Sequence, residues 1–252
     1  MNSVKIAEMD WVTYRDTVGQ GTCKILLPVG AIEQHGPHMS LNPDVLIPEH
    51  IACRVAERSG NMLVAPPIAY GYKSQVKSGG GNFFPGTTCV SGRALEEYAY
   101  DVILAFMAHG NREFIVLNGH YENSMFLVEA ADRAVKHARL AGIEIKVVLL
   151  SYWDFINEAT IEKVFPDGFS GWAVEHGGVL ETSIMLKIHP DLVDMSKAVD
   201  IAPAEFPPYD VFPPDPSWVP SSGTLSSPAK ATAEKGGWIL DECIEKISRT
   251  FG

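Results

Sequence analysis

Residues 25–36, ILLPVGAIEQHG, join a continuous apolar run to a short polar segment. Residues 114–123, FIVLNGHYEN, repeat that order further along the chain. Apolar runs of this length without alternation predict strands buried on both faces, as in a parallel sheet covered by helices. Ligands of such sheets bind beyond the carboxyl ends of the strands. We therefore expect the two polar segments to lie side by side at one end of a sheet.

Apolar runs of strand length alternate with longer helical patterns along the rest of the chain. The predicted strands are residues 24–29, 62–66, 114–117 and 143–150. The predicted helices are residues 48–59, 95–109, 124–141, 157–164, 179–188 and 231–251. This alternation predicts an α/β fold with a mostly parallel central sheet between two helical layers, a three-layer α/β/α sandwich. No internal repeat or long linker divides the sequence, so we expect a single domain over residues 1–252.

Residues 202–227 differ from the rest of the chain because they are rich in Pro, Ser and aromatic residues. Such a composition is compatible with a disordered segment. The interleaved aromatic residues and the helix that follows favour an ordered loop instead. We expect that loop to pack on the domain or on a neighbouring subunit.

The charge and the cysteines limit the classes of partner and compartment. The formal net charge is −11 and the pI is about 5.1, which argues against nucleic acid and anionic membranes as partners. The four cysteines are scattered without a C-x-x-C spacing, which fits free thiols in a reducing compartment. Residues 1–8 show no apolar signal segment, and no apolar run approaches the length of a membrane span. We expect a soluble, cytoplasmic protein.

Each of the two polar segments holds a carboxylate and an imidazole two positions apart. The pairs are Glu33 with His35 and His120 with Glu122. Either pair alone is compatible with a polar turn whose side chains are solvated. Their joint occurrence at two strand ends, beside glycines that allow tight turns, favours a metal site.

Asp44 adds a third carboxylate to this candidate site. We expect it on a loop ordered by Pro43, before a helix that begins near Pro48. Imidazole and carboxylate ligands without thiolate are typical of catalytic zinc or manganese sites, whereas structural zinc sites favour cysteine. A carboxylate that bridges two ions about 3.5–4 Å apart would hold a shared water and lower its pKa towards ~7. Asp44 is the candidate for that bridge, so the sequence predicts the ligand set of a two-metal hydrolase.

Two further segments carry candidate binding residues. The triple glycine in residues 70–82 lacks the order of a phosphate-binding P-loop and favours a flexible or close-approach loop, in which Ser78 can hydrogen-bond a small ligand. Trp172 precedes His176 by four residues in a glycine-flanked loop, and Trp153 lies upstream. Tryptophan is common in protein cores, but this setting favours a flat apolar slot beside a histidine that can move a proton.

Together these motifs resemble the creatininase family of hydrolases. The resemblance runs from about residue 10 to about residue 230 and rests on LPVGAIEQHG, YGYKSQVKSGGGN, NGHYENSMF, LSYWDF and EHGGVLETS. The patterns E-x-H-G and N-G-H-x-x-N are shared by the wider family. Residues 72–81, YKSQVKSGGG, and the two tryptophans are more specific to its creatinine-hydrolysing members.

The resemblance implies a homohexamer of α/β/α subunits that opens the creatinine ring to creatine reversibly. It implies two divalent metal ions per subunit, Zn²⁺ or Mn²⁺: Glu33 and His120 would hold one, His35 and Glu122 would hold a zinc, and Asp44 would bridge them. The implied catalytic residues are Glu122, His176, Trp153 and Trp172, with His176 donating a proton to the leaving ring nitrogen. The implied substrate-binding residues are Ser78, Tyr121, Trp172, Ala173 and His176.

One position departs from the family pattern, which has an acidic residue directly after the loop tryptophan, where this chain has Ala173. Substrate choice would differ if that carboxylate contacts the substrate, and would not if only its backbone does. Two other functions stay open. An amidase for another small amide, such as a formamide, is disfavoured by the Ser78 loop and the tryptophans. A metal- or ligand-binding protein without turnover is disfavoured by the open ligand set and the nearby histidine.

Overall fold

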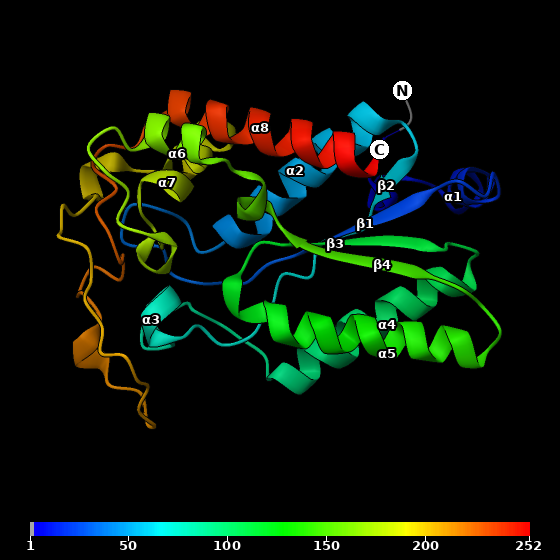
Figure 1. Cartoon of the computed structure of the whole chain (residues 1–252), viewed down its shortest axis with the longest axis horizontal. Helices are drawn as coiled ribbons and strands as arrows, with labels where there is room; N and C mark the ends of the chain where they lie inside the picture. Colours follow the sequence, from blue (N-terminus) through cyan, green and yellow to red (C-terminus); the bar gives the residue numbers. More distant parts are fainter. Residues whose placement is uncertain (1–2) are drawn as a thin grey trace.

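A computed structural model describes residues 3–252 of the chain. Within them, four parallel strands form a central sheet in the order β2-β1-β3-β4 (Figure 1). The strands are β1 (Lys24–Val29), β2 (Met62–Val64), β3 (Glu113–Asn118) and β4 (Lys146–Ser151). All four predicted strands are present, although β2 and β4 are shorter than predicted.

The register of the two central strands aligns their carboxyl ends. Ile25 of β1 pairs with Phe114 of β3, and Val29 pairs with Asn118. The polar segments that follow β1 and β3 therefore start from neighbouring points at the same end of the sheet, as the sequence predicts.

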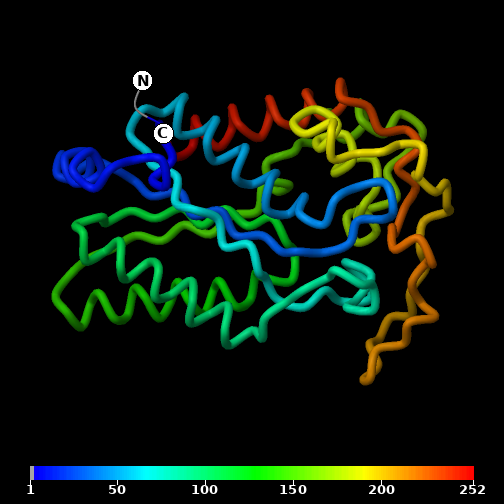
Figure 2. The backbone as a smooth tube through the Cα atoms, turned by 180° about the vertical axis from the view of Figure 1, so that it is seen from behind, coloured from blue at the N-terminus to red at the C-terminus, as the bar shows by residue number. Residues whose placement is uncertain are grey.

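Helices cover both faces of the sheet (Figures 1 and 2). One face carries α4 (Gly92–Ala108) and α5 (Ser124–Leu140). The other carries α2 (Pro43–Ser59), α6 (Glu158–Val164), α7 (Val179–Ile188) and α8 (Ala233–Phe251). This arrangement confirms the predicted three-layer architecture. The helices α1 (Trp11–Val18) and α3 (Val76–Gly79) were not predicted, because both are short and carry few buried residues.

Side chains of β1 alternate between two hydrophobic clusters. Ile25 and Leu27 belong to the cluster with α4 and α5, whereas Leu26 belongs to the cluster with α2, α7 and α8. All three are at most 2% exposed, which is why the strand reads as one continuous apolar run. β1 is thus buried on both faces, and only its ends are free to carry polar groups.

Residues 202–227 form an extended segment with a buried base and an exposed middle. Leu225 is buried, donates its N–H to the carbonyl of His176 at 3.0 Å and accepts from the N–H of Ala204 at 2.8 Å. Phe212 is 80% exposed. The base is an ordered loop packed on the rest of the chain, while the middle projects alongside α3 (Figures 1 and 2).

In the described part of the chain, no helix combines the length and the apolar character that a membrane span requires. The prediction that residues 1–8 lack a signal segment falls partly on residues 1 and 2, which lie outside the described residues.

Candidate metal centre

The candidate site lies where β1 and β3 end and α2 begins. Gly30 follows β1 and Gly119 follows β3, and a Cβ on either would lie 2.3 Å from the carbonyl oxygen of Asp44. Only glycine permits an approach this close. The two strand ends therefore pack directly against the first turn of α2, which places Asp44 beside the polar segments that follow them.

Asp44 lies within α2, so the prediction of a loop before a helix at Pro48 was wrong. Pro43 occupies the first turn of α2, where its missing N–H is harmless because the first N–H groups have no helical partner. Pro48 lies inside the helix and cannot donate to the carbonyl of Asp44, four residues earlier. That carbonyl is the one that the two glycines contact.

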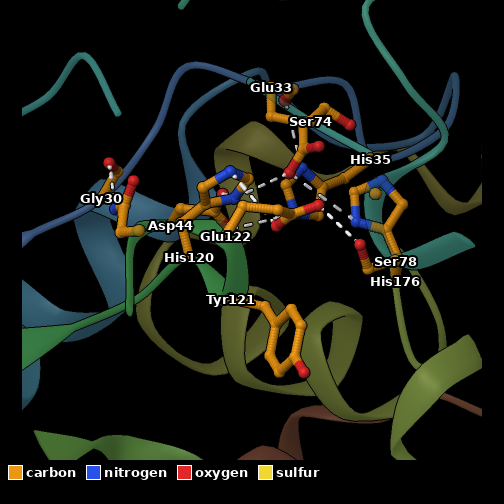
Figure 3. A network of polar contacts seen from close by, with 12 residues as sticks. Gly30, Glu33, His35, Asp44, Ser74, Ser78, His120, Tyr121, Glu122 and His176 are labelled. Carbon is orange, nitrogen blue, oxygen red and sulfur yellow. Dashed lines mark hydrogen bonds and ion pairs between the residues drawn. The ribbon is translucent and has the colours of Figure 1, made fainter. Parts of the chain in front are cut away.

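The two carboxylate oxygens of Asp44 face different histidines (Figure 3). Oδ2 lies 3.0 Å from Nδ1 of His120, and the same nitrogen lies 3.2 Å from Oε2 of Glu33. Oδ1 lies 3.1 Å from Nε2 of His35, which lies 3.6 Å from Oε2 of Glu181. Glu33, Asp44 and His120 each offer one ligand atom, and these atoms lie within 4.8 Å of one another. The same holds for His35, Asp44 and Glu181. Asp44 therefore separates two adjoining donor sets, each with one imidazole and two carboxylates.

Oε1 of Glu33 is buried without a hydrogen-bond partner among residues 3–252, and Nε2 of His35, although 3.1 Å from Oδ1 of Asp44, makes no hydrogen bond of regular geometry. Leaving a buried polar atom unpaired costs about 1–3 kcal/mol. Zinc and manganese bind imidazole nitrogen and carboxylate oxygen in this combination. The two atoms without a regular hydrogen bond and the thiolate-free donors therefore fit divalent metal ions.

Burial and close contact shift the pKa values of the cluster. Burial raises the pKa of Glu33 to about 7. Burial opposes the charged form of His35, but the neighbouring carboxylates, Asp44 first among them, outweigh it and raise its pKa to about 10. Burial also opposes the charged form of Asp44, yet the two histidines beside it lower its pKa. The buried carboxylates are therefore stabilised by nearby positive charge. Protonated histidines supply that charge here, and a bound cation supplies it when it displaces those protons.

Glu122 lies on the other side of His120, at the wall of a cleft. Its Oε2 is 3.3 Å from Nε2 of His120, and its Oε1 accepts a hydrogen bond of 2.6 Å from the hydroxyl of Ser78. The main-chain N–H of Gln75 donates to the same oxygen at 2.8 Å. Among the described residues, the groups of close donor atoms do not include Glu122.

His176 forms a third group of close donor atoms with Glu33 and His35, and its ring centre lies 4.3 Å from that of His35. Its Nε2 is 2.8 Å from the main-chain oxygen of Gln34 and 3.1 Å from the Gln34 side-chain nitrogen. That amide nitrogen already donates to the carbonyls of Gly79 and Gly223, so Nε2 of His176 is the donor to the Gln34 carbonyl. The lone pair is therefore on Nδ1. Burial lowers the pKa of His176 well below its usual range, so the ring is neutral.

A cleft of about 1070 Å³ opens beside the cluster. The predicted catalytic and substrate-binding residues all line it: Ser78, Tyr121, Glu122, Trp153, Trp172, Ala173 and His176. Tyr121 is 67% and Trp172 47% exposed, and the Tyr121 ring stands apart from the polar network (Figure 3). Trp153 also packs against the core, so it is part of the hydrophobic cluster as well as a cleft wall.

Residues 70–82 contain the short helix α3, where the sequence predicts a loop. The predicted close approach is present. A Cβ on Gly79 would lie 2.1 Å from Oε1 of Glu33, and one on Gly80 would lie 2.9 Å from the side-chain nitrogen of Gln34. Gly80 also has a positive φ of 80°. Glycine is therefore required for the chain to turn out of α3 against the cluster.

Four polar residues of the site have no role in the sequence prediction: Gln34, Asn123, Glu175 and Glu181. Asn123 is fully buried and donates to the carbonyl of Gly30 at 3.0 Å. Glu181 lies among the apolar residues of α7, and an acidic residue in such a helix is a signal that could have identified it. Gln34 and Asn123 carry no comparable signal, because most of the groups that they contact, such as the carbonyls of Gly223 and Gly30, are distant in sequence.

Known proteins that resemble this chain include creatinine amidohydrolases. The family model described as creatinine amidohydrolase matches residues 7–251. The creatinine amidohydrolase of Pseudomonas putida is 54% identical over 248 residues, which cover 98% of this chain and 95% of that protein. A crystal structure of creatinine amidohydrolase has a TM-score of 0.98 at 53% identity, covering 100% of this chain and 98% of that one.

Other solved structures of creatininase include a creatine complex, a manganese form and a Zn-Zn form. A variant complexed with creatine has a TM-score of 0.96 at 52% identity, covering 99% of this chain and 97% of that one. A manganese form at 53% identity and a Zn-Zn variant at 52% identity each have a TM-score of 0.97, with the same coverage.

Proposed function

This chain is a hydrolase that belongs to the creatininase family, and from that premise we propose that it interconverts creatinine and creatine by hydrolysing and re-forming the ring amide. The observation that carries the proposal is the position of Asp44 between two donor sets at the floor of a cleft. A cyclic amide in this cleft would present its carbonyl carbon to the donor sets and its ring to the aromatic walls.

We propose that the site binds two divalent ions per subunit, zinc or manganese. Glu33, Asp44 and His120 would hold one, and Asp44 with His35 would hold the other. The family resemblance implies Glu122 as a further ligand of the second ion, whereas the 3.6 Å distance from His35 favours Glu181 for that place. Bound divalent ions lower the pKa of a coordinated water and polarise a carbonyl oxygen.

His176 is the proposed proton carrier. Its neutral ring holds the lone pair on Nδ1, which lies 3.8 Å from Oε2 of Glu33, while Nε2 is fixed by the Gln34 carbonyl. Nδ1 can therefore take the proton of the attacking water and pass it to the ring nitrogen that leaves. Glu122, held by Ser78, is the second proposed group for moving protons at this wall of the cleft.

Aromatic walls are proposed to hold the flat ring of the substrate. Trp153 and Trp172 both line the cleft, with Tyr121 near them. Stacking on a planar guanidino ring is worth on the order of 1 kcal/mol per aromatic partner, and cation–π attraction adds to it when the ring is protonated. Ala173 also lines the cleft, and we propose that its small side chain leaves creatinine binding intact.

We also propose a cytoplasmic homohexamer in which residues 1–252 form one domain. The family resemblance supports the homohexamer. The four free cysteines support a reducing compartment. Light scattering on the purified protein checks the size of the oligomer.

Metal analysis coupled to a creatinine-to-creatine assay tests the proposed function. The expected result is two divalent ions per chain, turnover in both directions, and loss of activity after chelation. Turnover of a formamide but not of creatinine would point to another small amide as substrate. A fully metallated protein that converts neither would be a binding protein, and the proposal would be wrong.

A further inference from the structure

One lysine connects the cleft to the segment that projects beside it. We use the name arm for residues 206–212. Nζ of Lys77 lies 3.4 Å from the carbonyl oxygen of Pro207, 3.3 Å from that of Tyr209 and 3.2 Å from Oδ1 of Asp210. An ammonium group has three donors, so one lysine can satisfy all three acceptors at once.

The arm forms the outer part of the cleft. Phe206, Pro207, Asp210 and Phe212 line the cleft together with Lys77. Figures 1 and 2 show the arm beside α3 and away from the sheet. Among the hydrogen bonds of residues 3–252, those of Lys77 are the ones that join the arm to the rest of the chain. Lys77 is therefore the side chain that anchors this wall by polar contacts, while Tyr209 also packs against Trp218 at a ring-centre distance of 5.9 Å.

The same short helix also contacts the metal cluster. Ser78 follows Lys77 in α3 and donates to Glu122, and Gly79 lies against the carboxylate of Glu33. These close contacts fix α3 on its inner side, because Gly79 has no room to shift toward Glu33. Lys77 thus extends from a fixed helix to a segment with few other attachments.

We propose that Lys77 is a positioning residue that holds the arm in place as the outer wall of the substrate cleft. The expected effect on creatinine binding rests on the proposed function, whereas the role of Lys77 in holding the arm does not. When the arm leaves its place, the fraction of molecules with a complete cleft falls, and the apparent affinity for substrate falls by the same factor. The chemistry at the cluster is unaffected, because Lys77 contacts neither donor set.

Lys77→Met tests this role, with Lys77→Arg as the conservative variant and Lys73→Met as the matched control. Lys73 is exposed and lies four residues earlier in the same segment. We expect Lys77→Met to raise KM for creatinine about tenfold at nearly unchanged kcat, a loss of about 1.4 kcal/mol in binding. Metal content should stay at the wild-type level, Lys77→Arg should recover most of the affinity, and Lys73→Met should behave as wild type.

Limited proteolysis supplies a readout that does not need activity. The arm of Lys77→Met should be cleaved faster than that of the wild type or of Lys73→Met. A wild-type KM together with a wild-type cleavage rate in Lys77→Met would overturn the inference, as would equal effects of Lys73→Met. Loss of kcat and metal in Lys77→Met would also contradict it, since that pattern means a disturbed cluster. If the wild type does not hydrolyse creatinine, the proposed function fails while the cleavage rates still decide the role of Lys77.

Discussion

Nε2 of His35 lies 3.1 Å from Oδ1 of Asp44, and both side chains are almost completely buried. His35 comes from the segment after β1 and Asp44 from the first turn of α2, so the contact joins a strand end to a helix start. Ligand atoms about 2.1 Å from a tetrahedral zinc lie roughly 3.4 Å from each other. The spacing of this pair, and the 3.0 Å between Asp44 and His120, is that of a hydrogen-bonded ion pair, and small shifts would bring both pairs to the separation of two ligands on one ion.

Replacing His176 tests the proton carrier. We expect His176→Ala to keep its metal ions and to lose about 10²- to 10⁴-fold in kcat, the range for removal of a general acid or base. Metal stoichiometry, melting temperature and kcat of the variant check this. A missing ion would make His176 a metal ligand instead, and full activity would exclude any part in proton transfer.

The two tryptophans of the cleft are expected to differ in what their removal does. Trp172→Ala should lower kcat/KM for creatinine while the melting temperature stays close to that of the wild type, because its ring is 47% exposed. Misplacing the ring in the cleft can cost ~10²-fold in rate beyond the lost stacking.

Trp153→Ala should also lower kcat/KM but should destabilise the fold by up to about 3 kcal/mol, because this ring packs against the core. Urea unfolding and steady-state kinetics of both variants check the difference. Wild-type kinetics in both would mean that the substrate is not held between them.

We expect the titration of Glu175 to lower the free energy of unfolding as the pH rises. The residue is partly exposed, but its carboxyl group accepts from the N–H of Leu180, and burial there raises its pKa from 4.5 to about 8. Between these values the folded protein keeps a proton that the unfolded chain has released, so the free energy of unfolding decreases as the pH rises from 4.5 to 8.

Glu175→Gln keeps an acceptor for Leu180 and removes the titrating group. At pH 8.5 it should exceed the wild type in stability by on the order of 3 kcal/mol, and at pH 4.5 the gain should vanish. Urea unfolding of both proteins at the two pH values checks this. Parallel pH dependence of the two would show that Glu175 does not titrate in this range.

Glu181→Gln and Glu175→Gln form a matched pair, since each removes a carboxylate that lines the cleft and whose pKa is raised by burial. Of these two residues, Glu181 belongs to a donor set among residues 3–252 and Glu175 does not. We expect Glu181→Gln to weaken the binding of one ion at least about tenfold and Glu175→Gln to bind both normally. Zinc titration with a competing chelator measures this. Equal zinc binding by the two variants would remove Glu181 from the ligand set.

The strands and most helices could be predicted because their patterns are local. A strand buried on both faces, such as β1, is a continuous apolar run whatever packs on it. Helix α7 was predicted with the bounds that it has, Val179–Ile188. The start of α2 was not, because Pro48 resembles a first helical residue and only the packing of Gly30 and Gly119 explains the proline inside the helix.

The candidate site could be predicted where the ligands follow strand ends. Glu33, His35 and His120 lie together because β1 and β3 are neighbours, which the apolar runs already suggest. Glu181 comes from α7, and its place depends on how that helix packs on α2 and α8, which no local pattern contains. For the same reason the contact of Lys77 with the arm could not be foreseen from the sequence.

The central claim is that Asp44 is shared by two metal ions. Elemental analysis of the wild type, Asp44→Asn and Asp154→Asn tests it most directly. Asp154 also lines the cleft but belongs to neither donor set, so its variant is a control of the same chemistry. We predict two divalent ions per chain in the wild type and in Asp154→Asn, and loss of both ions and of activity in Asp44→Asn. Retention of two ions and full activity in Asp44→Asn would contradict the account.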